Sequence, residues 1–281
     1  MFRSVRGRVR KLLGRAGARP AAQTAAPETV APPAAEAPPP EPVAPVPPPA
    51  ALFDYANDNM MLLGKNTAFL QDPKFSAAWE AASELNKEGW RGSPPDIRWR
   101  AHVACWAAAQ ALRLEGDFVE CGVHTGLLSL AVCNYVDFNQ TGRNFWLFDT
   151  FAGIPPGHLE GQEVEHAQFM NEHYYFDVYD LARRNFASFP KAHLVRGVLP
   201  DSLAQAPIER IAYLSVDLNN AHAEKGAIER LWPKIVPGCV IVLDDYAFIN
   251  RVLQYHMWNG FAASVGRSIL TLPTGQGLLI R

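Results

Sequence analysis

The chain has 281 residues, with 26 Lys or Arg and 28 Asp or Glu, which gives a formal net charge of −2. Because seven of the basic residues and no acid fall within residues 1–19, the remainder is acidic, which argues against a nucleic-acid-binding core. No apolar run is long enough to cross a membrane as a helix. The four cysteines form no C-x-x-C pair, so we expect buried, reduced thiols in a cytoplasmic protein.

Residues 1–50 differ in composition from the rest of the chain. Residues 1–19 have apolar residues at helical spacing with arginines between them, which predicts a basic amphipathic helix. Such a helix would dock on the anionic inner face of a membrane, and a solvated, frayed terminus is the alternative. Residues 20–50 hold twelve of the 23 prolines, so we expect an extended, disordered linker there and a folded domain over 51–281.

The folded domain is predicted to begin with a helical extension over 51–114. Residues 51–90 read as helical, with aromatic residues that pack on the main domain, and Asp96 can cap a helix running to about Leu114. From residue 115 onwards, strand-like and helix-like segments alternate. The expected strands are 117–121, 145–148, 193–196, 211–216 and 239–243, and the expected helices are 127–135, 177–189, 223–231 and 248–258.

The chain closes with two short apolar runs, 268–272 and 277–280, joined by a Pro-Thr-Gly-Gln turn that is typical of a hairpin. Alternating strands and helices before such a hairpin predict an α/β, doubly wound, mostly parallel sheet with one antiparallel strand. A dinucleotide-binding dehydrogenase would continue with a sixth parallel strand. A seven-stranded, Rossmann-like methyltransferase sheet ends with an inserted antiparallel strand, so the hairpin favours a methyltransferase.

Acidic residues end two consecutive apolar strands: Asp217 follows the first, and Asp244 and Asp245 follow the second. The carboxyl ends of neighbouring parallel strands meet at the ligand crevice of an open sheet. Three carboxylates there repel each other unless a cation or a donor network neutralises them, and oxygen-only ligation suits Mg²⁺. The alternative is that Asp217 and Asp244 only cap the helices that follow. The adjacent pair exceeds what one cap needs and favours a metal site.

The first strand of the alternation carries Glu120 and leads into a turn that contains Gly122, His124 and Gly126. Glycines let the backbone approach a ligand at a helix N-terminus. An acid at this place suits a cationic ligand such as S-adenosylmethionine and would repel the diphosphate of NAD. The next strand ends in Asp149, where an acid commonly holds ribose hydroxyls; a turn cap is the alternative. His124 either lines the donor pocket or makes a structural hydrogen bond in the turn.

A series of motifs between about residues 115 and 250 follows a known pattern. The motifs occupy residues 119–123, 147–156, 197–203, 207–212, 214–217, 231–238 and 244–246. With them the chain resembles the sugar O-methyltransferases typified by the macrocin, mycinamicin and novobiocin enzymes. The resemblance implies a class I methyltransferase fold that binds S-adenosylmethionine, and it implies Mg²⁺ ligation by Asp217, Asp244 and Asp245. The predicted donor-site residues are Glu120, Gly122, His124, Gly126, Asp149, Thr150 and Asp217.

Position 219 departs from the family pattern. Members usually carry a second aspartate two residues after the first metal aspartate, and the resemblance implies that it is the catalytic base, but here the residue is Asn219. An amide cannot accept a proton at neutral pH. His222 is a candidate base, since histidine titrates near neutrality. The alternatives are that the metal alone acidifies the substrate hydroxyl, that activity is lost, or that His222 is a solvated or capping residue.

Residues 157–176 form a long polar insertion at the ligand end of the sheet, and we predict a substrate lid there. The spacing of its three histidines fits no standard zinc pattern.

Together these features predict an S-adenosylmethionine-dependent, Mg²⁺-assisted O-methyltransferase that acts on a hydroxyl of a sugar or glycosylated small molecule. The alternative is a non-catalytic binding or scaffold protein with a methyltransferase fold, tethered through residues 1–50, and Asn219 favours it. No nucleic-acid partner is expected, and a homo-oligomer stays open.

Overall fold

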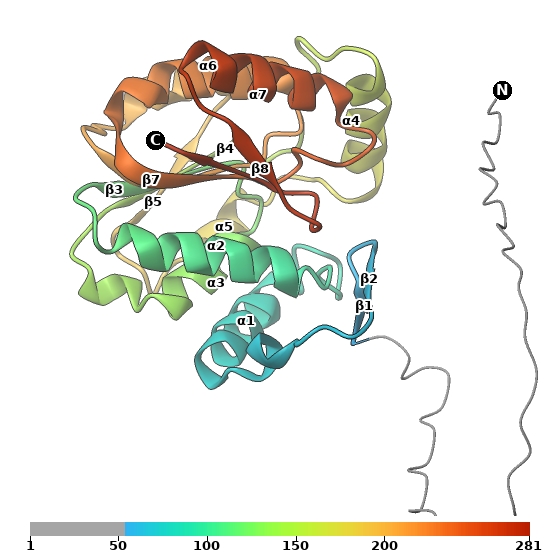
Figure 1. Cartoon of the computed structure of the whole chain (residues 1–281), viewed down its shortest axis with the longest axis vertical. Coiled ribbons are helices and arrows are strands. Elements are labelled where there is room, and N and C mark those ends of the chain that lie inside the picture. The colour runs from blue at the N-terminus through green and yellow to red at the C-terminus, as the bar shows by residue number, and fades with distance from the viewer. Residues whose placement is uncertain (1–53) are drawn as a thin grey trace, which may run out of the picture. The chain divides into compact units, whose positions relative to one another are not determined.

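The computed structural model describes residues 54–281 (Figure 1). The basic helix predicted at 1–19 and the linker predicted at 20–50 lie outside the described residues. The described part contains a seven-stranded sheet with the order β5-β4-β3-β6-β7-β9-β8. Its strands are β3 (Asp117–Cys121), β4 (Phe145–Asp149), β5 (Ala192–Arg196), β6 (Ile211–Val216), β7 (Ile235–Leu243), β8 (Ile269–Thr271) and β9 (Gly277–Ile280).

The strands β3 to β7 pair in parallel, and β9 runs antiparallel between β7 and β8. This arrangement confirms the predicted sheet and its C-terminal hairpin. The central strands form because their residues are apolar on both faces, and all six residues of β6 are buried. The chain reverses its winding direction between β3 and β6, so a crevice opens at the carboxyl ends of these two strands.

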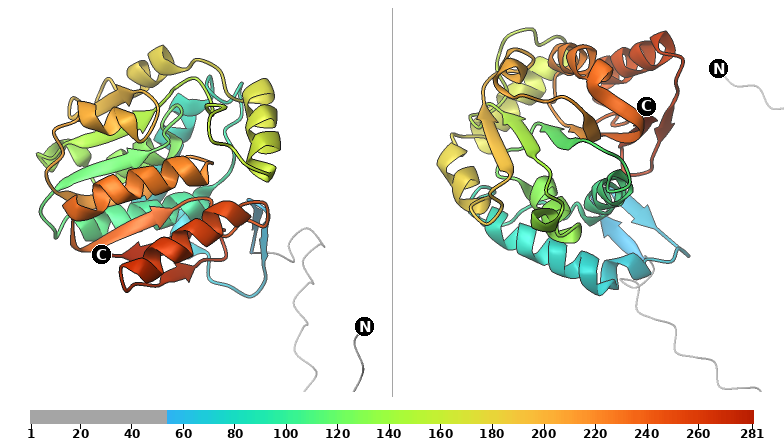
Figure 2. Two further views of the ribbon diagram at one scale, coloured as in Figure 1. Left: turned by 90° about the horizontal axis from the view of Figure 1, so that it is seen from above. Right: turned by 90° about the vertical axis from the view of Figure 1, so that its left-hand side faces the viewer.

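Helices cover both faces of the sheet (Figure 2). One apolar core joins the sheet to α1 (Pro73–Asn86), α2 (Arg98–Ala111), α3 (Leu127–Tyr135) and α5 (Tyr179–Asn185). A second core on the opposite face joins it to α6 (Ala221–Leu231) and α7 (Val252–Ser264). The four cysteines are buried and unpaired, as expected. None of the helices in residues 54–281 is long and apolar enough to cross a membrane.

The prediction of helix throughout 51–90 is wrong at its start. Residues Tyr55–Asn57 (β1) and Met60–Leu62 (β2) form an antiparallel hairpin. Asp58 and Asn59 connect the two strands and both have positive φ, at 55° and 57°. A two-residue turn with positive φ at both positions matches the twist of a hairpin, and Asp and Asn tolerate that conformation. Helix α1 begins only at Pro73, where Asp72 accepts a hydrogen bond from the Phe75 amide.

The insertion at 157–176 is largely helical and contains α4 (Gln162–His173). Helix boundaries elsewhere also differ from the prediction. Helix α5 ends at Asn185, and α7 starts at Val252 because the residues before it, 244–251, fold into a turn that carries Arg251 back to the strand ends. Strand β7 starts four residues early because Ile235 pairs with Ile211 before the chain bulges at Pro237 and Gly238.

Candidate active site

A cavity of about 410 Å³ lies at the carboxyl ends of the parallel strands. The turn after β3 and the loops after β4, β6 and β7 supply most of its walls, and α4 supplies His166 and Met170. Every residue that the sequence assigned to the donor, metal or catalytic set lines this cavity except Gly126. The parallel sheet therefore brings the predicted site together in one place.

Glu120 lines the cavity and is almost fully buried, with 3% of its surface exposed. Its Oε1 accepts a hydrogen bond of 2.7 Å from the Ser129 hydroxyl, whereas Oε2 has no partner among the described residues. Burial raises the pKa of Glu120 to about 8. A buried acceptor without a partner costs free energy, so this oxygen marks a place for a donor or cation.

The glycines of the turn are needed for close packing. Gly122 has φ of 92°, and a Cβ there would collide with the backbone carbonyl of Asp217 on the neighbouring strand. Gly126 begins α3, and a Cβ there would collide with the ring of Phe186. Gly122 thus lets β3 and β6 end side by side at the cavity, and Gly126 is a packing residue outside the cavity lining.

Asp149 holds the glycine turn in place. Its Oδ2 accepts hydrogen bonds from the amides of Val123 and His124, at 2.6 and 2.7 Å, and its Oδ1 accepts one from the Phe151 amide at 2.7 Å. Thr150 donates its hydroxyl to the Gly153 carbonyl at 2.6 Å. The turn-cap interpretation of Asp149 therefore describes contacts that exist, while the carboxylate still lines the cavity.

His124 has φ of 50° and lies between aromatic rings, with ring centroids 4.9 Å from Trp90 and 5.2 Å from Tyr175. Burial lowers its pKa to about 4, so the imidazole is neutral at physiological pH. Its Nε2 is buried without a partner among the described residues. The residues that line the cavity thus include aromatic rings, one ring nitrogen without a partner and one carboxylate oxygen without a partner among the described residues.

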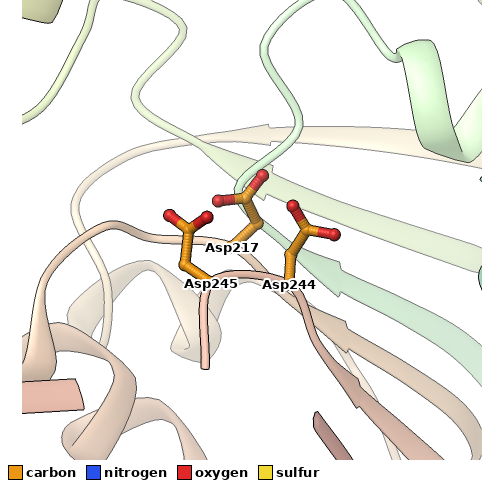
Figure 3. A group of neighbouring side chains, drawn as sticks. All are labelled: Asp217, Asp244 and Asp245. Carbon is orange, nitrogen blue, oxygen red and sulfur yellow. The ribbon is translucent and has the colours of Figure 1, made fainter. Parts of the chain in front are cut away.

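The three aspartates project from the ends of β6 and β7 on the same side (Figure 3). Each offers one carboxylate oxygen, and these three atoms lie within 4.8 Å of one another. Burial, together with the charges of Asp244 and Asp245, raises the pKa of Asp217 well above its usual range. Burial also raises the pKa of Asp245. Such carboxyls retain protons more readily unless a cation shares the site.

Two arginines hold the outer aspartates. Arg100 on α2 donates to Asp244 Oδ2 at 2.5 Å, and Gln276 donates to Asp244 Oδ1 at 2.9 Å. Arg251 donates to Asp245 Oδ2 at 3.1 Å. Asp217 accepts a side-chain hydrogen bond through Oδ1 and Asp245 through Oδ2, so the second oxygen of each carboxylate is left outside these bonds.

The charges around the cluster do not balance. Asp58 also binds Arg100, so four carboxylates (Asp58, Asp217, Asp244 and Asp245) surround two guanidiniums, which leaves a formal charge of −2 when all are ionised. The side chains that could ligate a metal here offer only oxygen atoms. This ligand type and the net negative charge both suit a hard divalent cation.

Asn219 lies beside the cluster with φ of 56°. Its Nδ2 donates to Asp217 Oδ1 at 3.0 Å, while its Oδ1 accepts a short hydrogen bond from Arg251 Nη2. The same Nη2 is 2.8 Å from Nε2 of His166 on α4. Burial, followed by the charge of Arg251, lowers the pKa of His166 to about 4. The neutral imidazole therefore lies 3.1 Å from Oδ1 of the residue that replaces the catalytic carboxylate implied by the resemblance.

His222, the base candidate from the sequence, lies in the first turn of α6 and lines the cavity. Its ring stacks on that of His158, with centroids 4.1 Å apart and planes inclined by 12°. Sequence reasoning did not assign a role to Arg100, Arg251 or Gln276, and it placed His166 in the lid only. No local sequence motif distinguishes an arginine whose side chain points into the protein, so the roles of these residues could not be predicted from the sequence.

The chain has a class I methyltransferase fold, with a parallel sheet, a terminal antiparallel hairpin and a ligand crevice at the strand ends. The family model for macrocin O-methyltransferase (TylF) matches residues 97–264, which is more than half of the chain. The chain therefore belongs to the macrocin O-methyltransferase family, as the motifs predicted.

Curated relatives with similar sequences are named as O-methyltransferases. The chain is 28% identical over 150 residues to an 8-demethyl-8-(2,3-dimethoxy-alpha-L-rhamnosyl)-tetracenomycin-C 4'-O-methyltransferase of Streptomyces olivaceus, a match that covers 51% of this chain and 58% of the relative. It is 26% identical over 155 residues to the mycinamicin III 3''-O-methyltransferase of Micromonospora griseorubida, covering 50% and 59%. The chain thus spans under two thirds of the length of these relatives.

Solved structures share the fold. The O-methyltransferase NovP superimposes with a TM-score of 0.61 at 19% identity, covering 77% of this chain and 99% of that one. An O-methyltransferase from Bacillus cereus superimposes with a TM-score of 0.52 at 14% identity, covering 76% and 94%.

Proposed function

We propose that the protein is an S-adenosylmethionine-dependent O-methyltransferase that acts on a hydroxyl of a sugar or glycosylated small molecule with the help of Mg²⁺. The observation that carries the proposal is a single cavity lined both by the buried Glu120 and by the three-aspartate cluster, in a chain of this family. Glu120 offers an unpartnered acceptor oxygen, and the three aspartates offer carboxylate oxygens within 4.8 Å of one another. The named reactions of the curated relatives support a sugar-like acceptor.

Glu120 and the turn after β3 fit the donor. S-adenosylmethionine has a positively charged ammonium at its amino-acid end, and the unpartnered Oε2 of Glu120 is an acceptor for it. Trp90 and the turn around His124 offer an apolar wall, and Asp149 is the candidate partner of the ribose. The Bacillus cereus neighbour was solved with the demethylated donor product, which agrees with this use of the fold.

The three-aspartate cluster fits Mg²⁺ in its charge and in its oxygen ligands. Asp217, Asp244 and Asp245 would hold the ion, which supplies the charge that lowers the pKa of a bound hydroxyl. Arg100 and Gln276 fix the orientation of Asp244, and Arg251 fixes that of Asp245. Tyr175 and the α4 residues His166 and Met170 line the same cavity beside the cluster.

Two histidines are candidates for removing the hydroxyl proton. His222 is the candidate from the sequence, and His166 contacts Asn219 Oδ1 at 3.1 Å. Both line the cavity, and Nε2 of His166 also lies 2.8 Å from Nη2 of Arg251. Asn219 orients Asp217 in this scheme and transfers no proton.

The test is a methylation assay of the full chain with S-adenosylmethionine and a panel of glycosylated and nucleotide-linked sugars. We expect mass-spectrometric detection of S-adenosylhomocysteine together with a methylated sugar, and loss of both after chelation of divalent ions. Absence of donor binding by calorimetry would overturn the proposal.

A non-catalytic binding protein is the second candidate, and the pairing of Asn219 with Arg251 favours it because no carboxylate base is present there. Donor binding without turnover on the whole panel would support this second candidate.

A further inference from the structure

The N-terminal hairpin reaches the aspartate cluster through one arginine. Asp58, in the turn between β1 and β2, accepts two hydrogen bonds from Arg100: Nε to Oδ2 at 2.8 Å and Nη2 to Oδ1 at 2.9 Å. The remaining nitrogen of Arg100, Nη1, donates to Asp244 at 2.5 Å. A single guanidinium therefore bridges the hairpin and the end of β7, across 144 residues of sequence between Arg100 and Asp244.

The bridge is shielded from solvent. The side chains of Asp58, Arg100 and Asp244 are 6%, 15% and 2% exposed. The guanidinium carbon of Arg100 also lies 5.6 Å from the centroid of the Phe248 ring. Charge pairs screened from water in this way interact more strongly than exposed pairs, and the forked contact fixes direction as well as distance.

We propose that Asp58 is a positioning residue for the metal cluster, which holds Arg100 so that Asp244 is oriented but keeps negative charge available for a divalent cation. This inference rests on the proposed function. If Arg100 faced Asp244 alone, its whole positive charge would act against a cation bound at the cluster. Asp58 offsets that charge from the far side, in the way that outer partners of metal ligands tune a site.

The rival explanation is a purely structural contact that fastens the hairpin to α2. It predicts a loss of stability when Asp58 is changed, with no change in the affinity of the cluster for a metal. Metal affinity therefore separates the two explanations, and turnover is not needed for the measurement.

The experiment is titration of the full chain with Mn²⁺, followed by calorimetry or electron paramagnetic resonance, in the wild type and in the variant Asp58→Asn. Asparagine tolerates positive φ as aspartate does, so the turn is retained. We expect Mn²⁺ affinity to fall about 10–100-fold, the usual effect of losing such an outer partner. Binding of S-adenosylmethionine should be unchanged, which also shows that the variant is folded.

The matched control is Asp54→Asn. Asp54 lies next to the same hairpin, and its carboxylate accepts from the Lys65 amide instead of from Arg100. We expect wild-type Mn²⁺ affinity in this control. A second variant, Arg100→Lys, keeps the charge but cannot bridge two carboxylates with a planar fork, and should also bind Mn²⁺ more weakly.

The outcomes are distinct. Equal Mn²⁺ affinity in wild type and Asp58→Asn overturns this inference and leaves the proposed function intact. Equal weakening by Asp54→Asn also overturns it, because the effect would then come from the hairpin as a whole. No Mn²⁺ binding by the wild type overturns the metal part of the proposed function, and this inference with it.

Discussion

Arg251 donates a hydrogen bond to the Oδ1 of Asn219, which places a fixed positive charge beside the position where the family resemblance implies a catalytic aspartate. The same guanidinium contacts Asp245 and His166, so the β6 loop, the β7 loop and α4 meet at one side chain. Its Nη1 is buried without a partner in the described part of the chain, and Arg251 lines the cavity. Replacement of the aspartate by Asn219 is thus accompanied by a histidine and a cation at the same place.

The affinity for S-adenosylmethionine should depend on pH because Glu120 ionises. Its pKa of about 8 in the ligand-free protein means that the carboxyl holds a proton at neutral pH, whereas a cationic ligand favours the ionised form. Affinity for S-adenosylmethionine should therefore rise between pH 6 and pH 8, by up to about tenfold per pH unit, with release of a proton. Calorimetry in buffers of different ionisation enthalpy measures that proton. The variant Glu120→Gln should lose the buffer dependence, and persistence there would exclude Glu120 as the source.

The raised pKa of Glu120 also makes the free energy of unfolding depend on pH, and this stability falls as the pH rises. The folded carboxyl binds its proton more tightly than the unfolded one, whose pKa is near the ordinary 4.5. The stabilisation is complete below that value and is lost as the pH rises towards 8. Thermal melts of the ligand-free chain should show this loss, and Glu120→Gln should remove it.

Asp149→Ala should weaken donor binding by about 1–3 kcal/mol, the range for losing a buried hydrogen-bonded partner. The reason is twofold, since the variant loses the candidate ribose contact and the two amides of the glycine turn lose their acceptor. Asp177→Asn is the control, because that carboxylate is exposed and, within residues 54–281, pairs only with Arg196 and the Tyr179 amide. Donor affinity equal to wild type in Asp149→Ala would remove Asp149 from the donor site.

The aspartate cluster should be needed for turnover and not for donor binding. Asp217→Asn or Asp245→Asn removes one negative ligand and should abolish methylation, while calorimetry with S-adenosylmethionine stays near the wild-type result. Methylation that survives both a chelator and these substitutions would show that the carboxylates have a structural role only.

The pH profile of the rate tests His166 as the catalytic base. A base must be deprotonated to act, so a rate limited by His166, whose pKa is about 4, should stay constant from pH 8 to pH 5. Alanine substitution of the true base should reduce the rate by about 10²–10⁴-fold. Equal activity of His166→Ala, His222→Ala and wild type would show that neither histidine is required.

Asn219→Asp should partly rescue whichever histidine variant is inactive. The introduced carboxylate would lie between Arg251, which favours its ionised form, and Asp217, whose negative charge opposes it. The rescued rate would show that the ionised form is available as a base. Failure to rescue would show that Arg251 neutralises the carboxylate too strongly for proton transfer.

The sequence predicted most of the sheet because buried parallel strands are continuous apolar runs, and β6 and β9 were placed to the residue. It also predicted that Asp217, Asp244 and Asp245 converge, since this follows from strand ends alone. It missed the hairpin around Asp58, because three-residue strands are too short to show alternation. It missed the inward arginines because a side chain's direction depends on tertiary contacts that no local pattern records.

The hydrogen bonds from Arg100 and Gln276 to Asp244 affect the order in which the site assembles. One oxygen is held through Arg100 by the start of the described domain and the other by Gln276, close to its end. Contacts so distant in sequence form late, because large loops must close before they can be made. On the ribosome, the cluster stays incomplete until residue 276 has emerged, so a nascent chain has no fully oriented metal site while its glycine turn is already synthesised.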